Sequence, residues 1–163
     1  MDVNIIEYNN KFDEQIKDLI VELQNYLIDI DNWHTLVMIP EFREGILKLD
    51  LNNVENKNGK IYLAVKNNNL LGLIIGYIED KDEEDKLTND CAKCGFVSEL
   101  IVKNQSRGNG IGKILLNKIE EYFKSVNCKR VNIEVFGPNK KGLNFYEKNG
   151  YVIRDIFVSK KLY

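Results

Sequence analysis

Cysteine, proline and histidine are scarce in this 163-residue chain, which has three, two and one of them respectively. An odd number of cysteines does not make a disulfide framework, and one histidine does not make a metal site. The longest apolar run, residues 70–78, is far shorter than the about 20 residues that a membrane helix needs. Residues 1–8 show no basic segment and no long apolar core. We therefore expect a reduced, cytoplasmic protein that has no secretion signal, membrane partner or metal.

An excess of charge of one sign is also missing. The 23 Lys and Arg residues nearly balance the 25 Asp and Glu residues, giving a formal net charge of -2. This balance argues against general affinity for nucleic acid. The length and the 44% hydrophobic content predict a single domain, residues 1–163, with its own core. The abundance of Asn, Lys and Ile is typical of an AT-rich bacterial genome.

Apolar periodicity predicts alternating strands and helices. Strands are expected near 4–8, 60–65, 70–79, 95–102 and 130–135, with one or two more within 151–162, and helices near 12–30, after Pro40, near 111–125 and near 139–149. The second helix is expected to turn Phe42, Ile46 and Leu49 inward. The hairpin turn at 67–69 favours antiparallel neighbours, and a helix between two strands favours a parallel pair. The predicted class is α/β, with a mixed, mostly antiparallel central sheet and helices on both faces.

Three glycines at alternate positions, Gly108, Gly110 and Gly112, connect a predicted strand to a predicted helix. The first N–H groups of a helix lack intrahelical partners and carry partial positive charge, so they favour phosphate. Arg107 adds a guanidinium suited to phosphate oxygens. The spacing matches neither the P-loop nor the GxGxxG dinucleotide pattern. A glycine turn without a ligand, or an unrelated nucleotide binder, remains an alternative.

Two motifs carry a resemblance to a known family. The segment LIVKNQSRGNGIGKILL resembles the acyl-coenzyme A binding segment of the GCN5-related N-acetyltransferases (GNAT), with Arg107, Gly110 and Gly112 in the matching positions. A second signature is matched by Asn139, Phe145, Tyr146, Lys148, Gly150 and Tyr151. Gly142 departs from it, because the family usually has alanine there. The resemblance is good over about residues 60–163 and poor over 1–59.

The resemblance implies transfer of an acetyl group from acetyl-coenzyme A to a primary amine, by direct attack in a ternary complex. Its implied cofactor-binding residues are Leu100, Ile101, Val102, Arg107, Gly108, Asn109, Gly110, Ile111, Gly112, Lys113, Asn139 and Tyr146. Tyr146 is the implied general acid for the departing thiolate, and its alternative is an ordinary amphipathic tyrosine. Asn139 serves equally well as a helix N-cap.

Glu99 is the candidate general base, acting directly or through water, and its alternative is a surface carboxylate on a strand. Ser98 is the neighbouring alternative and a candidate for binding the acceptor, expected on the opposite face of the strand because side chains alternate. Residues 25–34 contribute Tyr26, Asp29 and Trp33 as candidates for binding the acceptor. An amphipathic helix with a solvated polar face is the alternative there. The acceptor itself, a small-molecule or peptide amine, stays open.

A CxxC pair, Cys91 and Cys94, invites a zinc or redox interpretation. Tetrahedral zinc needs four ligands, and the remaining candidates, Cys128 and His34, do not have a fitting spacing. A non-catalytic acyl-coenzyme A sensor or interaction module on the same fold is the main alternative function. The family resemblance also allows a homodimer, although no stretch of the sequence indicates one.

Overall fold

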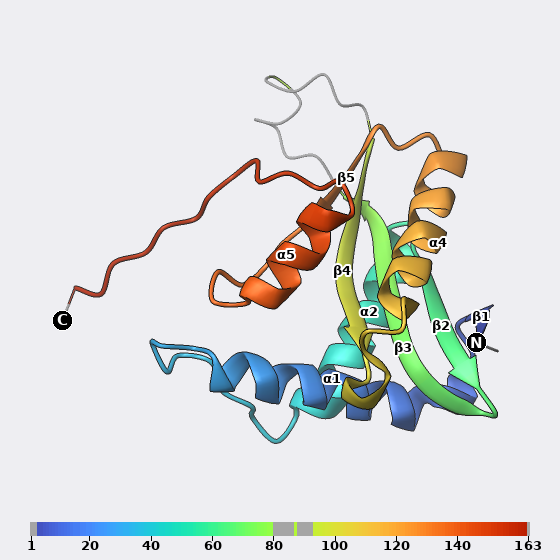
Figure 1. Ribbon diagram of the computed structural model, residues 1–163, viewed down its shortest axis with the longest axis horizontal. Helices are drawn as coiled ribbons and strands as arrows, with labels where there is room; N and C mark the ends of the chain where they lie inside the picture. The colour runs from blue at the N-terminus through green and yellow to red at the C-terminus, as the bar shows by residue number, and fades with distance from the viewer. Residues whose placement is uncertain (1–2, 80–86, 88–92, 163) are drawn as a thin grey trace.

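A computed structural model describes residues 3–79, 87 and 93–162. Its elements, labelled as in Figure 1, are β1 (Asn4–Glu7), η1 (Asn10–Phe12), α1 (Asp13–Asp29), α2 (Phe42–Asn56), β2 (Lys60–Lys66), β3 (Asn69–Glu79), β4 (Cys94–Val102), η2 (Asn104–Ser106), α4 (Ile111–Ser125), β5 (Arg130–Ile133) and α5 (Lys140–Lys148). Over these ranges, no helix is long and apolar enough to cross a membrane.

The strands form one five-stranded sheet in the order β1-β2-β3-β4-β5. The first four are antiparallel neighbours, and only β4 and β5 run parallel. The hairpin between β2 and β3 turns at Asn67 and Asn68, whose φ angles are 49° and 62°, a left-handed conformation that asparagine adopts more readily than most residues. The predicted mixed, mostly antiparallel sheet is confirmed.

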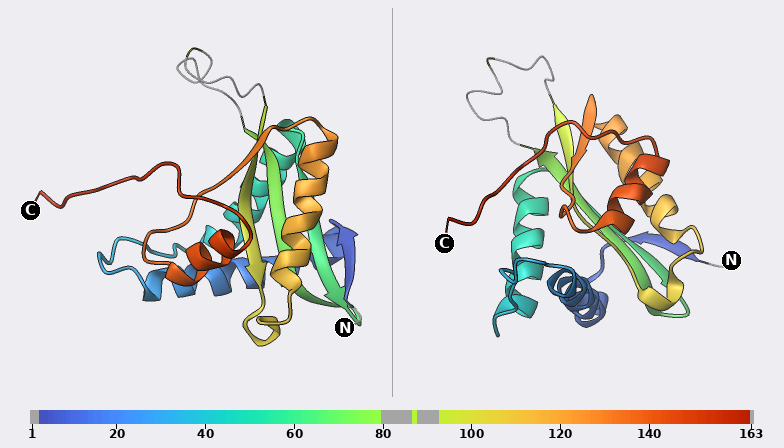
Figure 2. Two further views of the ribbon diagram at one scale, coloured as in Figure 1. Left: turned by 45° about the horizontal axis from the view of Figure 1, so that its top comes forward. Right: turned by 60° about the vertical axis from the view of Figure 1, so that its left-hand side comes forward.

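Both faces of the sheet are covered by helices, as Figure 2 shows: α1 and α2 lie on one side, and α4 and α5 on the other. Leu63, Leu73 and Ile101 face α1 and α2 within one buried apolar cluster. The second cluster, between the sheet and α4, contains Ile74 and Leu115. Burial of apolar surface on both faces therefore fixes which way each strand residue points.

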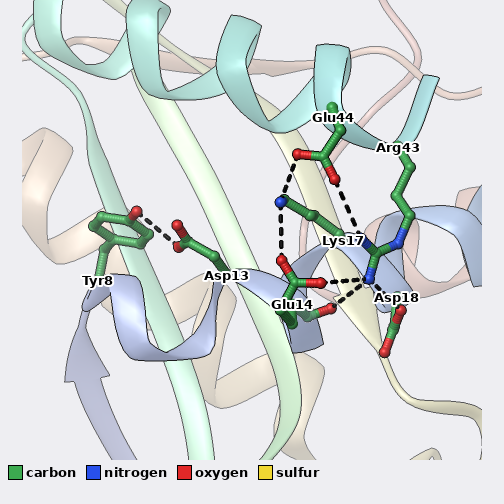
Figure 3. Close-up of polar contacts among 7 residues, drawn as sticks. All are labelled: Tyr8, Asp13, Glu14, Lys17, Asp18, Arg43 and Glu44. Atoms are coloured by element: carbon green, nitrogen blue, oxygen red, sulfur yellow. Dashed lines mark hydrogen bonds and ion pairs between the residues drawn. The ribbon is translucent and has the colours of Figure 1, made fainter. Parts of the chain in front are cut away.

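Ion pairs join α1 to α2 at the surface (Figure 3). Arg43 on α2 lies 3.0 Å from Glu14 and 2.8 Å from Asp18, both on α1. Lys17 on α1 reaches Glu14 at 3.0 Å and Glu44 at 2.6 Å. A network of this kind aligns the two helices more than isolated surface pairs do. Both helices pack against β3.

Two expectations about the fold are wrong. Leu49 is 59% exposed, and Leu47 and Asp50 take the buried positions of α2 instead. Residues 151–162 contain no strand, and Phe157 among them is 94% exposed. A strand needs backbone hydrogen bonds to a neighbouring edge, and this segment leaves the sheet (Figure 1). Near its end, the Lys161 ammonium donates to the Trp33 carbonyl at 3.3 Å.

Candidate active site

The sheet opens along β4. Its pairing with β5 runs from Cys94 to Val97, whereas its pairing with β3 continues to Val102. From residue 98 to residue 102, the edge of β4 that faces β5 therefore has no strand partner within the described part of the chain. This exposed edge contains Leu100, Ile101 and Val102, the segment expected to pair with the pantetheine arm. An unpaired strand edge offers N–H and C=O groups to an extended ligand.

The glycine turn lies between β4 and α4, and its glycines differ in role. Gly108 and Gly110 have φ angles of 79° and 77°, and a Cβ at either would meet nothing within 4 Å. Left-handed backbone favours glycine at both. Gly112 instead packs closely, since a Cβ there would lie 3.3 Å from the Phe145 ring of α5. The open space beside Gly108 and Gly110 fits a bound ligand.

The N-terminus of α4 has no side-chain cap. Gly110 occupies the N-cap position, and no described side chain accepts a hydrogen bond from the first turn, which includes Ile111, Gly112 and Lys113. The Asn109 side-chain amide stabilises the turn by donating hydrogen bonds to the Ser106 and Arg107 carbonyls at 3.3 and 3.4 Å. The first N–H groups of α4 are therefore in position to bind an anion such as a phosphate.

Arg107 is held beside the end of β4. Its Nε donates to the Val102 carbonyl at 2.9 Å, and one terminal nitrogen lies 3.5 Å from Glu22 on α1. Glu22 also accepts a hydrogen bond from the Asn104 backbone N–H at 2.9 Å. Glu22 was not identified from the sequence. Its contacts position both ends of the turn that precedes α4.

Asn139 caps α5 and joins it to α1. Its Oδ1 accepts from the Gly142 N–H at 3.0 Å and from the Tyr26 hydroxyl at 3.2 Å. A Cβ at position 142 would lie 2.6 Å from the Asn139 side-chain nitrogen. The glycine that departs from the family pattern therefore makes room for this asparagine. The N-cap interpretation of Asn139 is confirmed, and a contact with a cofactor stays a prediction.

Tyr146 lies on α5, facing the sheet within the apolar cluster on the α4 side. Its ring packs edge-on against Phe145 and Tyr151, with ring centroids 5.3 and 5.7 Å away. Burial, together with the nearby charge of Glu99, raises the pKa of Tyr146 to about 12. The phenol is therefore protonated at neutral pH. Across the described residues, no group accepts a hydrogen bond from its hydroxyl.

A β-bulge brings Ser98 and Glu99 to the same side of the sheet. In the pairing with β3, Ile75 opposes Glu99 and the next residue, Gly76, opposes Val97, so Ser98 is the extra residue. Val97 packs on the α4 face, but the Ser98 hydroxyl is 3.5 Å from Asp50 on α2. The expectation that Ser98 and Glu99 face opposite ways is therefore wrong, because a bulge breaks strand alternation.

Burial governs the charge of Glu99. Desolvation, and secondarily the charge of Asp50, raises the pKa of Glu99 to about 8. Asp50 is only 6% exposed, and desolvation raises its pKa to about 6, against the lowering effect of the Ser98 hydrogen bond. Sequence reasoning missed Asp50. The available signal was its position four residues after Ile46, on the inward face of the helix.

The candidate acceptor residues lie around the loop after α1. Asp31 accepts hydrogen bonds from the backbone N–H groups of Trp33, Thr35 and Leu36 at 2.7–2.9 Å, so it organises this loop. Asp29 is exposed and Trp33 is 41% exposed. Neither contacts Glu99 in the structure, and their role in binding an acceptor stays a prediction.

The CxxC motif lies at the edge of the described region. Cys94 is buried at the start of β4, and Cys91 is outside the described residues. Over the described ranges, no three His, Cys, Asp or Glu side chains are grouped so as to hold a metal ion.

Replacing Glu99 with glutamine will make the free energy of unfolding less sensitive to a rise in pH. Because the folded-state pKa of about 8 exceeds the ordinary glutamate pKa of about 4.3, the folded state binds more protons between these values, and stability falls as pH rises through them. We expect the free energy of unfolding of Glu99→Gln, relative to wild type, to increase by on the order of 3 kcal/mol from pH 4.5 to 8.5. Urea denaturation at both pH values measures it. The substitution of an exposed residue, Glu121→Gln, serves as the control. If the free energy of unfolding changed by the same amount between the two pH values in all three proteins, the prediction would be wrong.

Residues 27–151 match the Acetyltransferase (GNAT) family. The chain belongs to this family. A glucosamine 6-phosphate N-acetyltransferase of Arabidopsis thaliana is 31% identical over 77 residues, covering 47% of this chain and 50% of that protein. One from Dictyostelium discoideum is 28% identical over 65 residues, 40% of each chain. The matched part of this GNAT chain thus spans half or less of the length of these relatives.

Solved structures share the whole fold. A putative acetyltransferase from Pyrococcus furiosus has a TM-score of 0.72 at 22% identity, covering 99% of this chain and 100% of that one. A predicted acetyltransferase from Clostridium acetobutylicum, solved with acetyl-CoA, has a TM-score of 0.73 at 19% identity, with 98% and 96% covered. At these identities, the likeness establishes the GNAT fold of the chain and nothing finer.

Proposed function

We propose that this GNAT protein transfers an acetyl group from acetyl-CoA to a primary amine, by direct attack in a ternary complex. One observation carries the proposal: the unpaired edge of β4 beyond Val97 leads directly into the turn of Gly108 and Gly110, where the backbone is open. The acetyl-CoA in the Clostridium acetobutylicum structure and the names of the Arabidopsis and Dictyostelium relatives support it.

The two ends of this opening fit the two ends of acetyl-CoA. The uncapped N-terminus of α4 and Arg107 would hold the pyrophosphate. The free edge of β4 at Leu100 to Val102 would pair with the pantetheine arm, and a backbone N–H there would support the thioester oxygen. Acetyl-CoA, when bound, supplies the activated acetyl thioester.

Glu99 and Tyr146 would move the protons. The Glu99 carboxylate accepts one proton from the acceptor ammonium, so that the neutral nitrogen can form a bond to the acetyl carbon as the carbon–sulfur bond breaks. Tyr146 donates its proton to the departing sulfur and recovers one from the nitrogen. The products are an amide and the coenzyme thiol, and the proton held by Glu99 passes to solvent.

Release of coenzyme thiol tests the proposal. Purified protein is mixed with acetyl-CoA and a panel of amines (glucosamine 6-phosphate, amino acids, spermidine, an aminoglycoside and a peptide N-terminus), and free thiol is measured with the amide product. Acceptor-dependent thiol release supports N-acetyl transfer. Tight acetyl-CoA binding by calorimetry, without release for any amine, would favour a sensor on the same fold.

Replacing Glu99 with glutamine will also remove the acidic limb of the pH–rate profile. A base must be deprotonated to work, and burial raises the pKa of Glu99 to about 8. Wild-type kcat/KM is therefore expected to climb until about pH 8, whereas the variant shows no inflection near pH 8 and is about 10²-fold lower there. Rates from pH 6 to 9.5 with the best amine of the panel measure this. An acidic limb that is unchanged in Glu99→Gln would exclude the residue as the base.

A further inference from the structure

Asp50 holds a buried carboxylate oxygen that has no partner. The residue is 6% exposed, on the inner face of α2. Its Oδ1 is 3.5 Å from the Ser98 hydroxyl, at the limit of a hydrogen bond, and its Oδ2 has no hydrogen-bond partner among the residues that the structure describes. Asp31, the other buried acid in the described part of the chain, is fully engaged by loop donors. A buried polar atom without a partner is unfavourable for folding, so its presence calls for a ligand or a catalytic use.

Asp50 and Glu99 are neighbouring acids, and no described lysine or arginine compensates their negative charge. The bulge in β4 turns Ser98 and Glu99 toward α2, and the charge of Asp50 helps to raise the pKa of Glu99. Among the described residues, no lysine or arginine contributes to the pKa of either acid. By contrast, Glu14, Asp18 and Glu44, on the surface of α1 and α2, are paired with Lys17 and Arg43 (Figure 3). A cationic ligand would supply the positive charge that this inner pair lacks among the described residues.

The position of the pair suits the reacting end of an acceptor. Ser98 and Glu99 are partly exposed, whereas Asp50 lies beneath them. Glu99 is also close enough to Tyr146 to influence its pKa. A small cationic group that reaches Glu99 from solvent thus comes close to Asp50, whose charge acts on Glu99, and to the free edge of β4.

We propose that Asp50 Oδ2 accepts a hydrogen bond from the protonated primary amine of the acceptor, so that Asp50, Ser98 and Glu99 together form an ammonium subsite. This inference rests on the proposed function and deepens it. The acceptor binds as a primary alkylammonium, and hydroxyl compounds of the same shape are rejected because they leave the acid pair without a counter-charge. Asp50 is then a specificity-determining residue, and the proton transfers remain with Glu99 and Tyr146.

Binding of butylammonium chloride to the wild-type protein tests the subsite directly. The side-chain carboxyl carbons of Asp50 and Glu99, assigned through bonds in uniformly ¹³C- and ¹⁵N-labelled wild-type protein, are followed by ¹³C NMR at fixed pH and ionic strength. We expect both signals to shift saturably with butylammonium and to stay in place with n-butanol, which has the same shape but no charge. Equal responses to the two compounds, or none to butylammonium, would overturn the proposal.

Kinetics of the Asp50→Asn variant provide the second measurement. We expect the KM of the amine to rise about ten- to a hundredfold, the range for loss of a charge-assisted hydrogen bond, with an unchanged Kd for acetyl-CoA and a smaller change in kcat. Glu55→Gln, an exposed acid on the same helix, controls for lost charge. An unchanged KM would refute the role of Asp50. The NMR result requires no turnover, so it decides the subsite even if the protein is not an acetyltransferase or Asp50→Asn does not fold.

Discussion

Replacing Tyr146 with phenylalanine will lower kcat by about 10²-fold and leave the affinity for acetyl-CoA within about twofold. The substitution removes one hydroxyl and keeps the ring contacts with Phe145 and Tyr151, so the packing of α5 is preserved. Single-turnover thiol release, with the acetyl-CoA Kd from calorimetry, measures both quantities.

The size of this effect follows from how the hydroxyl must act. A phenol with a pKa of about 12 is a weaker acid than a thiol, whose ordinary pKa is about 8.5, so it does not protonate the thiolate alone. Tyr146 has to give its proton to sulfur while it takes one from the nitrogen that has just attacked. Phenylalanine interrupts this relay, whereas binding of the coenzyme phosphates does not depend on it.

Tyr8 provides a matched control. Burial, with a hydrogen bond to Asp13 at 2.8 Å, raises its pKa to about 12 as well, but it precedes α1 and lies away from β4. Tyr8→Phe should leave kcat unchanged. If Tyr146→Phe also turned over at the wild-type rate, Tyr146 would be an ordinary amphipathic tyrosine of the core.

Local signals explain how much of the fold could be predicted from the sequence. The asparagine turn at 67–69, the periodicity of α1 and the glycines before α4 each depend on neighbouring residues only, and the structure confirms all three elements. The β2–β3 hairpin and the helical crossover from β4 to β5 then account for the antiparallel and parallel pairing of these strands. The predicted strands within 151–162 are absent, because strand formation also depends on a partner edge that the segment's own composition does not specify.

The bulge and the buried acid could not be predicted in this way. Nothing in the pattern around Ser98 marks an extra residue, because a bulge is visible only in the register between β3 and β4. Asp50 lies on the inward face of α2, where an apolar residue is expected. Hydrophobicity predicts that the neighbouring Leu49 faces inward instead, but Leu49 is exposed. Conflict between residue type and position is typical of functional sites. An acid at a position where an apolar residue is expected therefore indicates a candidate functional residue.

Placing an aspartate at Gly110 will weaken acetyl-CoA binding by 10²-fold or more. A side chain at this position has open space around it, and under the proposed function that space is where the pyrophosphate binds. Two unit charges about 4 Å apart repel by about 4 kcal/mol at an effective dielectric constant of about 20. Even after partial screening, this repulsion is larger than the binding free energy that corresponds to a 10²-fold loss of affinity. Isothermal titration calorimetry with acetyl-CoA at low and high salt measures the effect.

Gly110→Asn is the control that isolates charge from backbone conformation. The φ of 77° at position 110 is a region that asparagine and aspartate both tolerate better than other side chains, and the two are nearly equal in size. The asparagine variant should therefore lose much less affinity for acetyl-CoA than the aspartate variant. Added salt should reduce the difference between their affinities. If the two variants bind acetyl-CoA equally well, no phosphate lies at the N-terminus of α4, and the proposed cofactor site is wrong whatever the enzyme acetylates.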